Sequence, residues 1–230
     1  STDSEYPSTS DTPYETAISL PGGETTISAV TVSEEGLVSR LTLLGYTIGG
    51  VVEEVTLSDV AIDASIRQLL QVSNEHTLYT DELWTITEFQ IPGEAASLSD
   101  LRLLPFLTKL TLSESKLENI GSSLSSLVNL ETLEITDTIL SSEDLQVIGN
   151  LPKLTKLTLS GCSLSGIGAL SGSTKLTYLD LRNNTIRDLT AISAMSNLET
   201  LLLSQNAVTA LDALGKLTKL KELSTMRLRS

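Results

Sequence analysis

Leucine residues recur at a spacing of about 22 residues, and this spacing constrains the fold of the 230-residue chain more than any other feature of its sequence. Three consecutive segments begin at Leu154, Leu176 and Leu198 and follow one pattern, L-x-x-L-x-L-x-x-(N/C)-x-(L/I/V), with no gap between them. A single match would carry little weight because leucine is common, but three matches in one register are not expected by chance. Each repeat therefore predicts one coil of a solenoid, in which a coil contacts mainly its neighbours.

The same pattern extends beyond these three segments. Further segments begin upstream at Leu130, at Leu107 and, with a looser fit, at Ile86, and downstream at Leu220. The pattern is the signature of the leucine-rich repeat. We therefore predict an α/β fold, a right-handed leucine-rich repeat solenoid over residues 86–230. Its concave side is expected to carry a parallel β-sheet and its convex side irregular or short helical segments.

Particular positions within each repeat are predicted to hold its turns together. In the L-x-L element the two leucines point inward and their neighbours point outward, as in any β-strand. The Asn side chains at Asn184 and Asn206 can bond the backbone of the turn, and the thiol of Cys162 is expected to point inward in the same way. Residues 140–150, with Ser141 near their start, are the clearest candidate for a convex helix.

The chain before the repeats begins with two segments of different composition. Residues 1–13 are rich in Ser, Thr, Asp and Pro and are predicted to be a flexible acidic tether. Residues 14–57 are predicted to be β-rich, because β-branched residues cluster at Thr26–Val32 and Val38–Leu44 between glycine-containing turns. The sequence leaves open whether this segment forms a small β domain or a sheet laid over the first repeat.

Residues 58–85 are predicted to form a helical cap. Asp59 is a suitable residue to accept hydrogen bonds at the start of a helix. The apolar residues that follow approximate helical spacing, and they are Val60, Ile62, Ile66, Leu69 and Leu70. Because the first coil of a solenoid has an exposed apolar end, a helix at this place in the chain is suited to cover it.

The cap and the repeats together carry a family resemblance. Residues Asp59–Leu70 and Thr77–Ile86, followed by repeats of about 22 residues, resemble the helical cap and first repeats of internalin-type bacterial leucine-rich repeat proteins. The resemblance covers residues 58–223. It implies a non-enzymatic module that binds another macromolecule, above all a protein, outside the cell or at the bacterial cell surface.

Acidic residues are concentrated in the first part of the chain. Residues 1–100 contain 17 Asp and Glu against 2 Lys and Arg, whereas residues 101–230 contain 12 against 13. Nucleic acid is not predicted as a partner, because contacts to phosphates need Lys and Arg. No segment of the sequence is long and apolar enough to predict a membrane span.

The sequence predicts neither catalysis nor a cofactor or metal site. Its one cysteine, Cys162, and its one histidine, His76, cannot form a zinc site without carboxylates. The acidic pairs Glu53–Glu54 and Glu143–Asp144 are adjacent in sequence, so their members do not converge as an acid and a base would. We therefore expect a binding protein rather than an enzyme.

One group of residues on the predicted concave sheet has the composition of a protein-binding site. Most outward positions carry small polar residues, whereas binding hot spots favour Trp, Tyr and Arg. The cluster of Tyr178, Asp180, Arg182 and Leu202 meets this criterion, and we predict that it binds the partner. The alternative is that these are ordinary strand residues that pack against one another across strands.

Two other functions remain open from the sequence: a structural spacer within a larger surface protein, and an intracellular regulatory subunit with the same repeats. A signal peptide or lipid-attachment motif in the uncut gene product would favour the extracellular role. At the other end of the chain, the pattern breaks over Leu223–Ser230 and leaves an unpaired strand edge. This edge predicts either an unrecognised cap or end-to-end self-association.

Overall fold

The computed structural model describes residues 23–29, 42–48 and 52–225. The chain divides into two compact units, Ser1–Glu53 and Glu54–Ser230.

In the first unit, β1 (Gly23–Ala29) and β2 (Thr42–Ile48) pair as antiparallel strands. Both lie within the segment predicted to be β-rich. Residues 30–32 and 38–41 of the two predicted clusters lie outside the described residues. The predicted tether of residues 1–13 lies outside the described residues.

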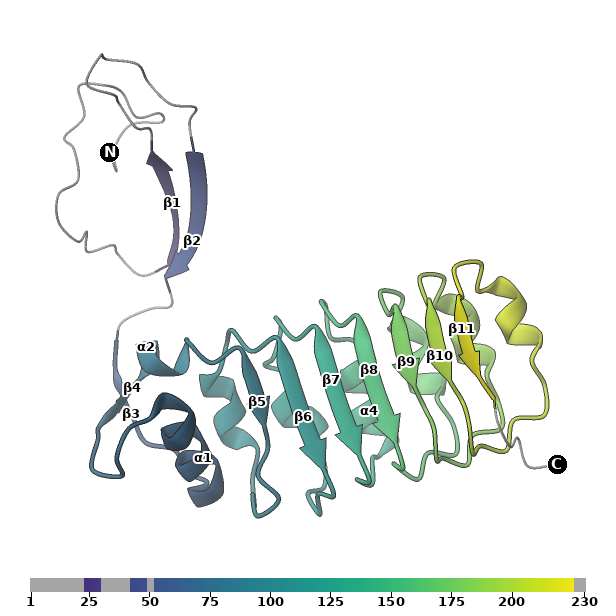
Figure 1. The fold of residues 1–230 in the computed structure, drawn as a ribbon, viewed down its shortest axis with the longest axis horizontal. Coiled ribbons are helices and arrows are strands. Elements are labelled where there is room, and N and C mark those ends of the chain that lie inside the picture. Colours follow the sequence, from purple (N-terminus) through teal and green to yellow (C-terminus); the bar gives the residue numbers. More distant parts are fainter. Residues whose placement is uncertain (1–22, 30–41, 49–51, 226–230) are drawn as a thin grey trace. The chain divides into compact units, whose positions relative to one another are not determined.

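The second unit is built around one parallel sheet (Figure 1). Within the described part of the chain its strands lie in sequence order: β5 (Glu88–Gln90), β6 (Lys109–Ser113), β7 (Thr132–Thr136), β8 (Lys156–Ser160), β9 (Tyr178–Asp180), β10 (Thr200–Leu202) and β11 (Glu222–Ser224). Leu157 on β8 lies opposite Leu179 on β9, which lies opposite Leu201 on β10. The repeated leucines therefore occupy neighbouring parallel strands, as the sequence predicts.

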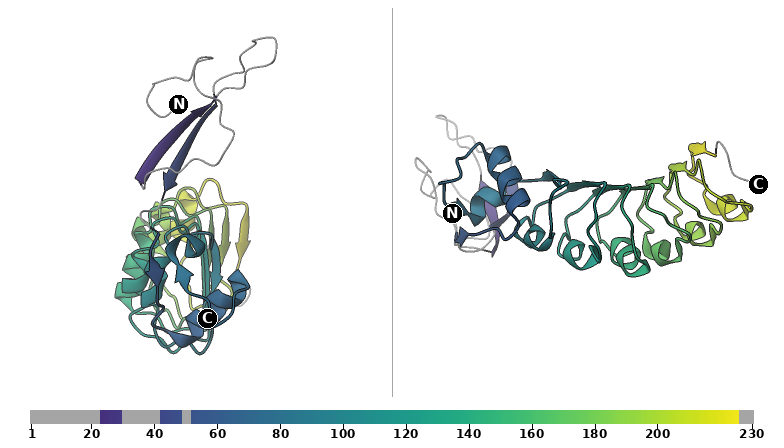
Figure 2. Two further views of the ribbon diagram at one scale, coloured as in Figure 1. Left: turned by 90° about the vertical axis from the view of Figure 1, so that its left-hand side faces the viewer. Right: turned by 90° about the horizontal axis from the view of Figure 1, so that it is seen from below.

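Short helices return the chain along the other side of each coil (Figure 2). They are η1 (Ser99–Leu103), α3 (Gly121–Leu124), α4 (Ser142–Gly149), η2 (Gly168–Gly172), η3 (Thr190–Ala194) and η4 (Asp212–Lys216). The predicted convex helix is confirmed as α4. The Ser141 hydroxyl accepts a hydrogen bond from the Asp144 N–H, and the Asp144 carboxylate accepts one from the Ser141 N–H. The unit is a leucine-rich repeat solenoid.

The core of the solenoid consists of stacked aliphatic side chains joined by buried amides. Leu157, Leu179 and Leu201 are fully buried. The Asn184 amide donates to the carbonyls of Leu159 and Leu181, and its oxygen accepts from the Leu164 N–H. Because Leu159 and Leu164 belong to the preceding coil, the side chain of Asn184 connects two coils. The predicted role of this asparagine is confirmed.

Asn206 and Cys162 occupy the same position in their own repeats. The Asn206 amide donates to the Leu181 carbonyl, one coil earlier, and its oxygen accepts from the Ile186 N–H. The Cys162 thiol points inward and donates to the Ile135 carbonyl at 3.4 Å. Burial raises the pKa of the Cys162 thiol to about 11, so the group stays protonated at neutral pH and is a poor nucleophile.

A second regular feature, which the leucine spacing does not predict, lies just after the strands. One residue in each of five successive turns has a positive φ angle, and these residues are Glu114, Asp137, Gly161, Asn183 and Gln205. Each directly precedes the Asn or Cys position of its repeat. Gly, Asn and Asp adopt this conformation most readily. Three of the five turns carry such a residue, which was a recognisable signal in the sequence.

The N-terminal end of the solenoid is covered by a helical cap. The cap consists of β3 (Glu54–Val55), α1 (Val60–Leu70), β4 (Leu78–Tyr79) and α2 (Thr80–Leu83). β3 pairs with β4, so residues 54–55, which come just before the predicted cap, are joined to it by this pairing.

Two carboxylates fasten α1 to the first coil. Asp59 accepts hydrogen bonds from the N–H groups of Ala61 and Ile62 and so caps α1, as expected. Its other oxygen accepts from the N–H groups of Ala96 and Ser97 in the first coil. Asp100, also from that coil, accepts from the N–H groups of Ser58 and Asp59.

The apolar face of α1 is narrower than the sequence predicts. Ile62 and Ile66 are fully buried, but Val60 is 85% exposed and Leu69 is also exposed. At about 100° per residue, Val60 points away from Ile62 and towards solvent. Leu69 is in the last turn of α1.

Within the described residues, no helix is long and apolar enough to cross a membrane.

Candidate protein-binding surface

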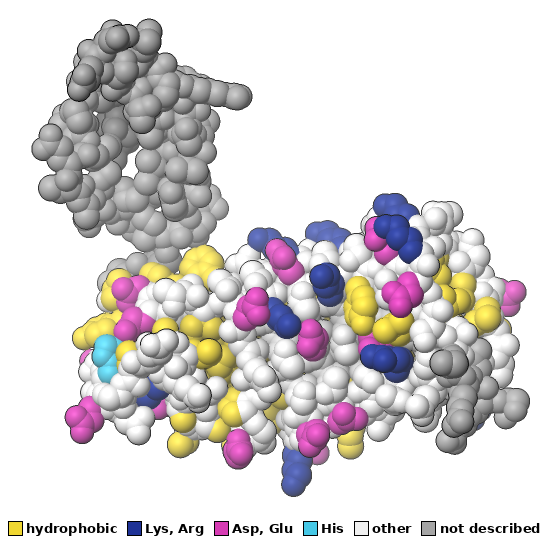
Figure 3. All heavy atoms as spheres, viewed as in Figure 1, with side chains coloured by type: hydrophobic (Ala, Val, Ile, Leu, Met, Phe, Trp, Pro, Cys, Tyr) yellow, Lys and Arg dark blue, Asp and Glu magenta, His cyan; other side chains and the backbone are white. Residues whose placement is uncertain are grey.

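The concave sheet offers a surface of mainly small polar side chains. Its outward positions include many hydroxyl groups, such as those of Thr111, Ser113, Thr132, Thr136, Thr158, Ser160, Thr200 and Ser204. Basic, acidic and hydrophobic side chains lie among them on the face shown in Figure 3. The surface therefore has little aromatic or aliphatic area for a partner to cover, except where larger residues gather.

Larger residues gather on β9 and β10. Tyr178 lies opposite Thr200, and Leu202 lies opposite Asp180, so the tyrosine and the leucine are diagonal neighbours on adjacent strands. Both side chains are only partly buried. We call Tyr178, Leu202 and Arg182 the concave patch. The structure brings these three predicted residues to one part of the sheet.

Asp180 does not have the exposed position that its place on the strand suggested. It is 1% exposed, because the guanidinium of Arg182 lies over it. The Arg182 Nε donates to Asp180 Oδ1 at 2.9 Å, and Nη2 donates to Oδ2 at 2.6 Å. Asp180 also accepts from the Arg182 backbone N–H at 3.0 Å. A partner would therefore touch Arg182, while Asp180 holds Arg182 in place.

The ion pair leaves the patch with one half-exposed guanidinium in a fixed orientation. The Arg182 side chain is 47% exposed, and its Nη1 group has no hydrogen-bond partner among the described residues. The hydrogen bonds to Asp180 raise the pKa of Arg182, so the group stays charged. Such fixed donors suit an acceptor on a partner, such as a carbonyl oxygen, because little rotamer freedom is lost on binding.

Tyr178 contributes a neutral phenol beside this pair. Burial raises the pKa of its hydroxyl, and the carboxylate of Asp180 raises it further. The hydroxyl is therefore protonated at neutral pH and can donate a hydrogen bond while the ring offers an apolar contact. The chemistry available is that of recognition: an apolar contact area next to directed donors.

The other ion pairs of the concave sheet are exposed and are expected to contribute little. The Lys109 Nζ on β6 lies 3.4 Å from the Glu134 Oε1 on β7. The Lys221 Nζ lies 2.8 Å from the Glu199 Oε2, next to β10 and β11. Pairs of this kind typically stabilise a protein by about 0–1 kcal/mol.

Among the described residues, no cluster of His, Cys, Asp or Glu is suited to hold a metal ion.

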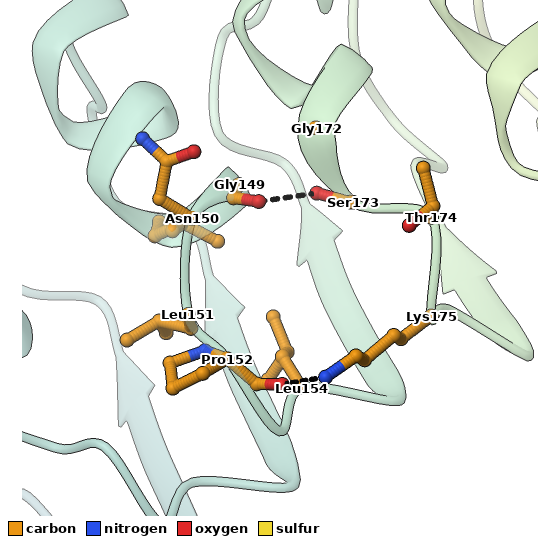
Figure 4. Close-up of a pocket in the computed structure, with 10 residues that line it drawn as sticks. Gly149, Asn150, Leu151, Pro152, Leu154, Gly172, Ser173, Thr174 and Lys175 are labelled. Carbon is orange, nitrogen blue, oxygen red and sulfur yellow. Dashed lines mark hydrogen bonds between the residues drawn. The ribbon is translucent and has the colours of Figure 1, made fainter.

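A small hollow of about 160 Å³ lies between the turns that follow α4 and η2 (Figure 4). The Lys175 Nζ donates to the Pro152 carbonyl at 2.6 Å, and the Ser173 hydroxyl donates to the Gly149 carbonyl at 3.3 Å. Asn129 and Asn197 make the same kind of bond to a carbonyl one coil earlier. This feature therefore belongs to the links between coils and not to a ligand site.

Known proteins with leucine-rich repeats are similar to this chain in sequence or in fold. The family profile "Leucine Rich repeats (2 copies)" matches residues 152–194. No curated protein matches the chain. Among solved structures, internalin C2 from Listeria monocytogenes is similar, with 23% identity over 71% of this chain and 82% of that chain and a TM-score of 0.57.

Two further solved structures are less similar in shape or in extent. Internalin F from Listeria monocytogenes aligns over 74% of this chain and 76% of that chain with 22% identity, but its TM-score is 0.29. TLR13, solved in complex with ssRNA13, has 27% identity and a TM-score of 0.51, and the match covers 64% of this chain and 23% of that chain. The similarity to internalin C2 therefore concerns the fold.

Proposed function

The chain is a leucine-rich repeat protein with the fold of internalin C2, and we propose that it binds another protein through the concave patch. Leucine-rich repeat proteins generally mediate protein–protein interactions. The patch combines a tyrosine, a leucine and an arginine on a sheet whose other outward positions are mostly small and polar. Tyrosine and arginine are enriched in binding hot spots, and the leucine adds apolar contact area beside them.

The fixed guanidinium of Arg182 is the observation that carries this proposal. Ordinary strand arginines lose side-chain entropy when a partner immobilises them, at a cost of about 0.5–1.5 kcal/mol. In this protein Asp180 has already fixed Arg182 through hydrogen bonds of 2.6 to 3.0 Å. A partner that places an acceptor near Nη1 and an apolar side chain over Tyr178 and Leu202 would use all three residues of the patch.

We further propose that this interaction takes place outside the cell or at a bacterial cell surface. This proposal rests on the resemblance of residues 58–223 to internalin-type bacterial leucine-rich repeat proteins. The acidic, Ser- and Thr-rich composition of residues 1–13 is also compatible with an extracellular tether.

Photo-crosslinking from the sheet itself tests the concave patch. A benzoyl-phenylalanine would replace Thr158, which lies opposite Asp180 on β8, and in a control protein it would replace Val128, which is exposed on the turn after α3. We expect a discrete crosslinked partner from position 158, identified by mass spectrometry in extracellular material, and none from position 128. Equal crosslinking from the two positions would remove the concave face as the binding surface.

Substitution of the patch then tests the individual residues. Purified partner should bind at least tenfold more weakly to the Tyr178→Ala/Arg182→Ala variant than to the native chain, while the thermal melt stays within a few degrees. A Thr132→Ala/Lys156→Ala variant, changed at outward positions on β7 and β8, serves as a matched control and should bind normally. Unchanged binding by the Tyr178→Ala/Arg182→Ala variant would show that these residues only pack across strands.

A second contact is proposed at the last coil, between two copies of this chain. Leu211 and Leu223 are 42% and 41% exposed, although the matching leucines of the preceding coil are buried. Pairing of two β11 edges would cover them. Sedimentation velocity over a hundredfold range of concentration should show a growing dimer, and Leu223→Asp should abolish it. A native chain that stays monomeric across the range would exclude this contact.

A further inference from the structure

A second hollow, of about 540 Å³, lies where the chain leaves β6 and β7. Its walls are the turn that starts at Glu114 and the turn that starts at Asp137. This hollow is separate from the concave patch, which lies on β9 and β10. It is formed by residues that the sequence analysis assigned no function.

The hollow contains an apolar surface with no cover. Ile139 is 78% exposed, although it adjoins Leu140, which is buried. Leu117 from the neighbouring coil lines the same hollow and is only partly buried. A single exposed aliphatic residue is common on protein surfaces. In this hollow, however, Ile139 and Leu117 both line the walls, and together they offer a place for an apolar side chain.

Charged residues around this apolar surface give it a negative balance. Glu114, Glu118 and Asp137 line the hollow together with one basic residue, Lys116. All four are exposed, and none has a side-chain hydrogen bond or ion pair among the described residues. Acidic side chains are also visible along the lower edge of the sheet in Figure 3. A ligand with positive charges would therefore meet carboxylates that form no ion pair with another described residue.

Asp144 also lines the hollow, but it already has partners. Its carboxylate is buried and accepts hydrogen bonds from the N–H groups of Gly121 and Ser141. It therefore fixes the start of α4 and adds little to the binding of a ligand. The accessible balance is that of three carboxylates against one ammonium group.

The walls of the hollow are held by hydrogen bonds between coils. The Glu114 N–H donates to the Thr136 carbonyl at 3.0 Å, and the Asp137 N–H donates to the Ser160 carbonyl at 2.9 Å. Within the first of the two turns, the Leu117 N–H donates to the Ser115 hydroxyl at 3.1 Å. The hollow therefore exists before a ligand arrives, which lowers the entropy cost of binding.

We infer that this hollow binds an extended protein segment in which an aliphatic side chain is flanked by Lys or Arg on the same face. The aliphatic side chain would cover Ile139 and Leu117, and the basic residues would pair with Glu114 and Asp137. In an extended segment, side chains two residues apart point the same way. The segment therefore carries basic, aliphatic and basic residues at alternate positions. This inference does not depend on the concave patch.

A fluorescein-labelled peptide, Lys-Ser-Leu-Ser-Arg, is a direct probe, and its binding can be measured by fluorescence anisotropy. One matched peptide replaces Leu by Ser, and another replaces both basic residues by Glu. We expect the probe to bind, and both control peptides to bind more weakly by about tenfold or more. Binding should weaken as the salt concentration rises from about 50 to about 500 mM, because salt screens interactions between exposed charges. Methyl resonances of Ile139 and Leu117 should shift on titration.

Variants of the chain complete the test. Ile139→Ser should weaken probe binding by roughly tenfold, since burial of one isoleucine corresponds to about that factor in the dissociation constant. The matched variant Val128→Ser changes another exposed aliphatic residue, outside the hollow, and should leave binding unchanged. The inference is overturned if the probe fails to bind, if Ile139→Ser and Val128→Ser behave alike, or if the methyl shifts appear at Leu202 on the concave patch. Tyr178→Ala should not affect the probe.

Discussion

The two ends of the solenoid differ in how far the apolar side chains of their outermost coils are covered. At the N-terminal end, Ile62 and Ile66 of α1 are fully buried against the first coil. At the other end, Leu223 occupies the position of Leu179 and Leu201 but is 41% exposed, because no described residue stacks beyond it. The first coil is covered, and the last described coil is not.

This comparison shows that the coil pattern alone does not decide how much a leucine stabilises the fold. Leu179 and Leu223 have equivalent places in the repeat and the same inward direction. One has a neighbouring coil on each side, whereas the other has a neighbour on one side. In a solenoid the free energy comes largely from the interfaces between coils. Identical residues should therefore differ in their effect on unfolding.

Leu179→Ala should have the largest effect. The side chain is fully buried between β8 and β10, so truncation removes apolar burial and leaves a cavity. We expect a loss of roughly 2–5 kcal/mol in the free energy of unfolding, measured by urea denaturation. A loss below about 1 kcal/mol would contradict the placement of Leu179 between two coils.

The coils were predictable because their determinants are local and repeated. The spacing of the leucines identified every strand from β5 to β11, and the Asn or Cys position indicated that the side chains of Asn184, Asn206 and Cys162 point inward to the backbone. Their hydrogen bonds to the preceding coil are seen only in the structure. Asp59 and Ser141 were also recognisable as helix caps, since a cap requires a particular residue just before an apolar periodic segment.

Other features could not be predicted because they depend on contacts between residues that no local pattern joins. Glu54–Val55 pair with Leu78–Tyr79, although α1 separates these two short strands in the sequence. Asp180 is buried because the side chain of Arg182 folds back over it. The alternation along a strand predicts that both side chains point outward, but it does not predict that one covers the other.

The capped end can be weakened specifically through Asp59. Its carboxylate caps α1 and accepts from two N–H groups of the first coil. Asp59→Ala should cost roughly 1–3 kcal/mol, because it removes a helix cap and leaves backbone N–H groups without partners. Hydrogen exchange should accelerate at the amides of Ile62 and Ala96 and stay unchanged at Leu201. Equal acceleration across all coils would show that the cap and the solenoid unfold together.

Acid should affect the same end with a smaller change. Burial raises the pKa of Asp59, but hydrogen bonds from Ile62, Ala96, Ser97 and Ala61 outweigh this and hold the pKa below its usual value. A carboxylate with a lowered folded-state pKa stabilises the protein above its unfolded pKa, and this contribution is lost as pH falls through the folded value. Cap stability, followed by hydrogen exchange, should therefore decrease below about pH 4. In Asp59→Asn this decrease should be smaller.

Leu223→Ala should have the smallest effect and therefore gives the sharpest test of the difference between the ends. Its side chain is already 41% exposed, and truncation opens no enclosed cavity, so we expect a loss below about 1 kcal/mol in dilute solution. Leu201→Ala, one coil earlier, is the matched control and should cost roughly 2–5 kcal/mol. If Leu223→Ala costs as much as Leu201→Ala only at high protein concentration, a second copy covers β11. If the two costs are equal at every concentration, another part of the same chain covers it, and the two ends are equally protected.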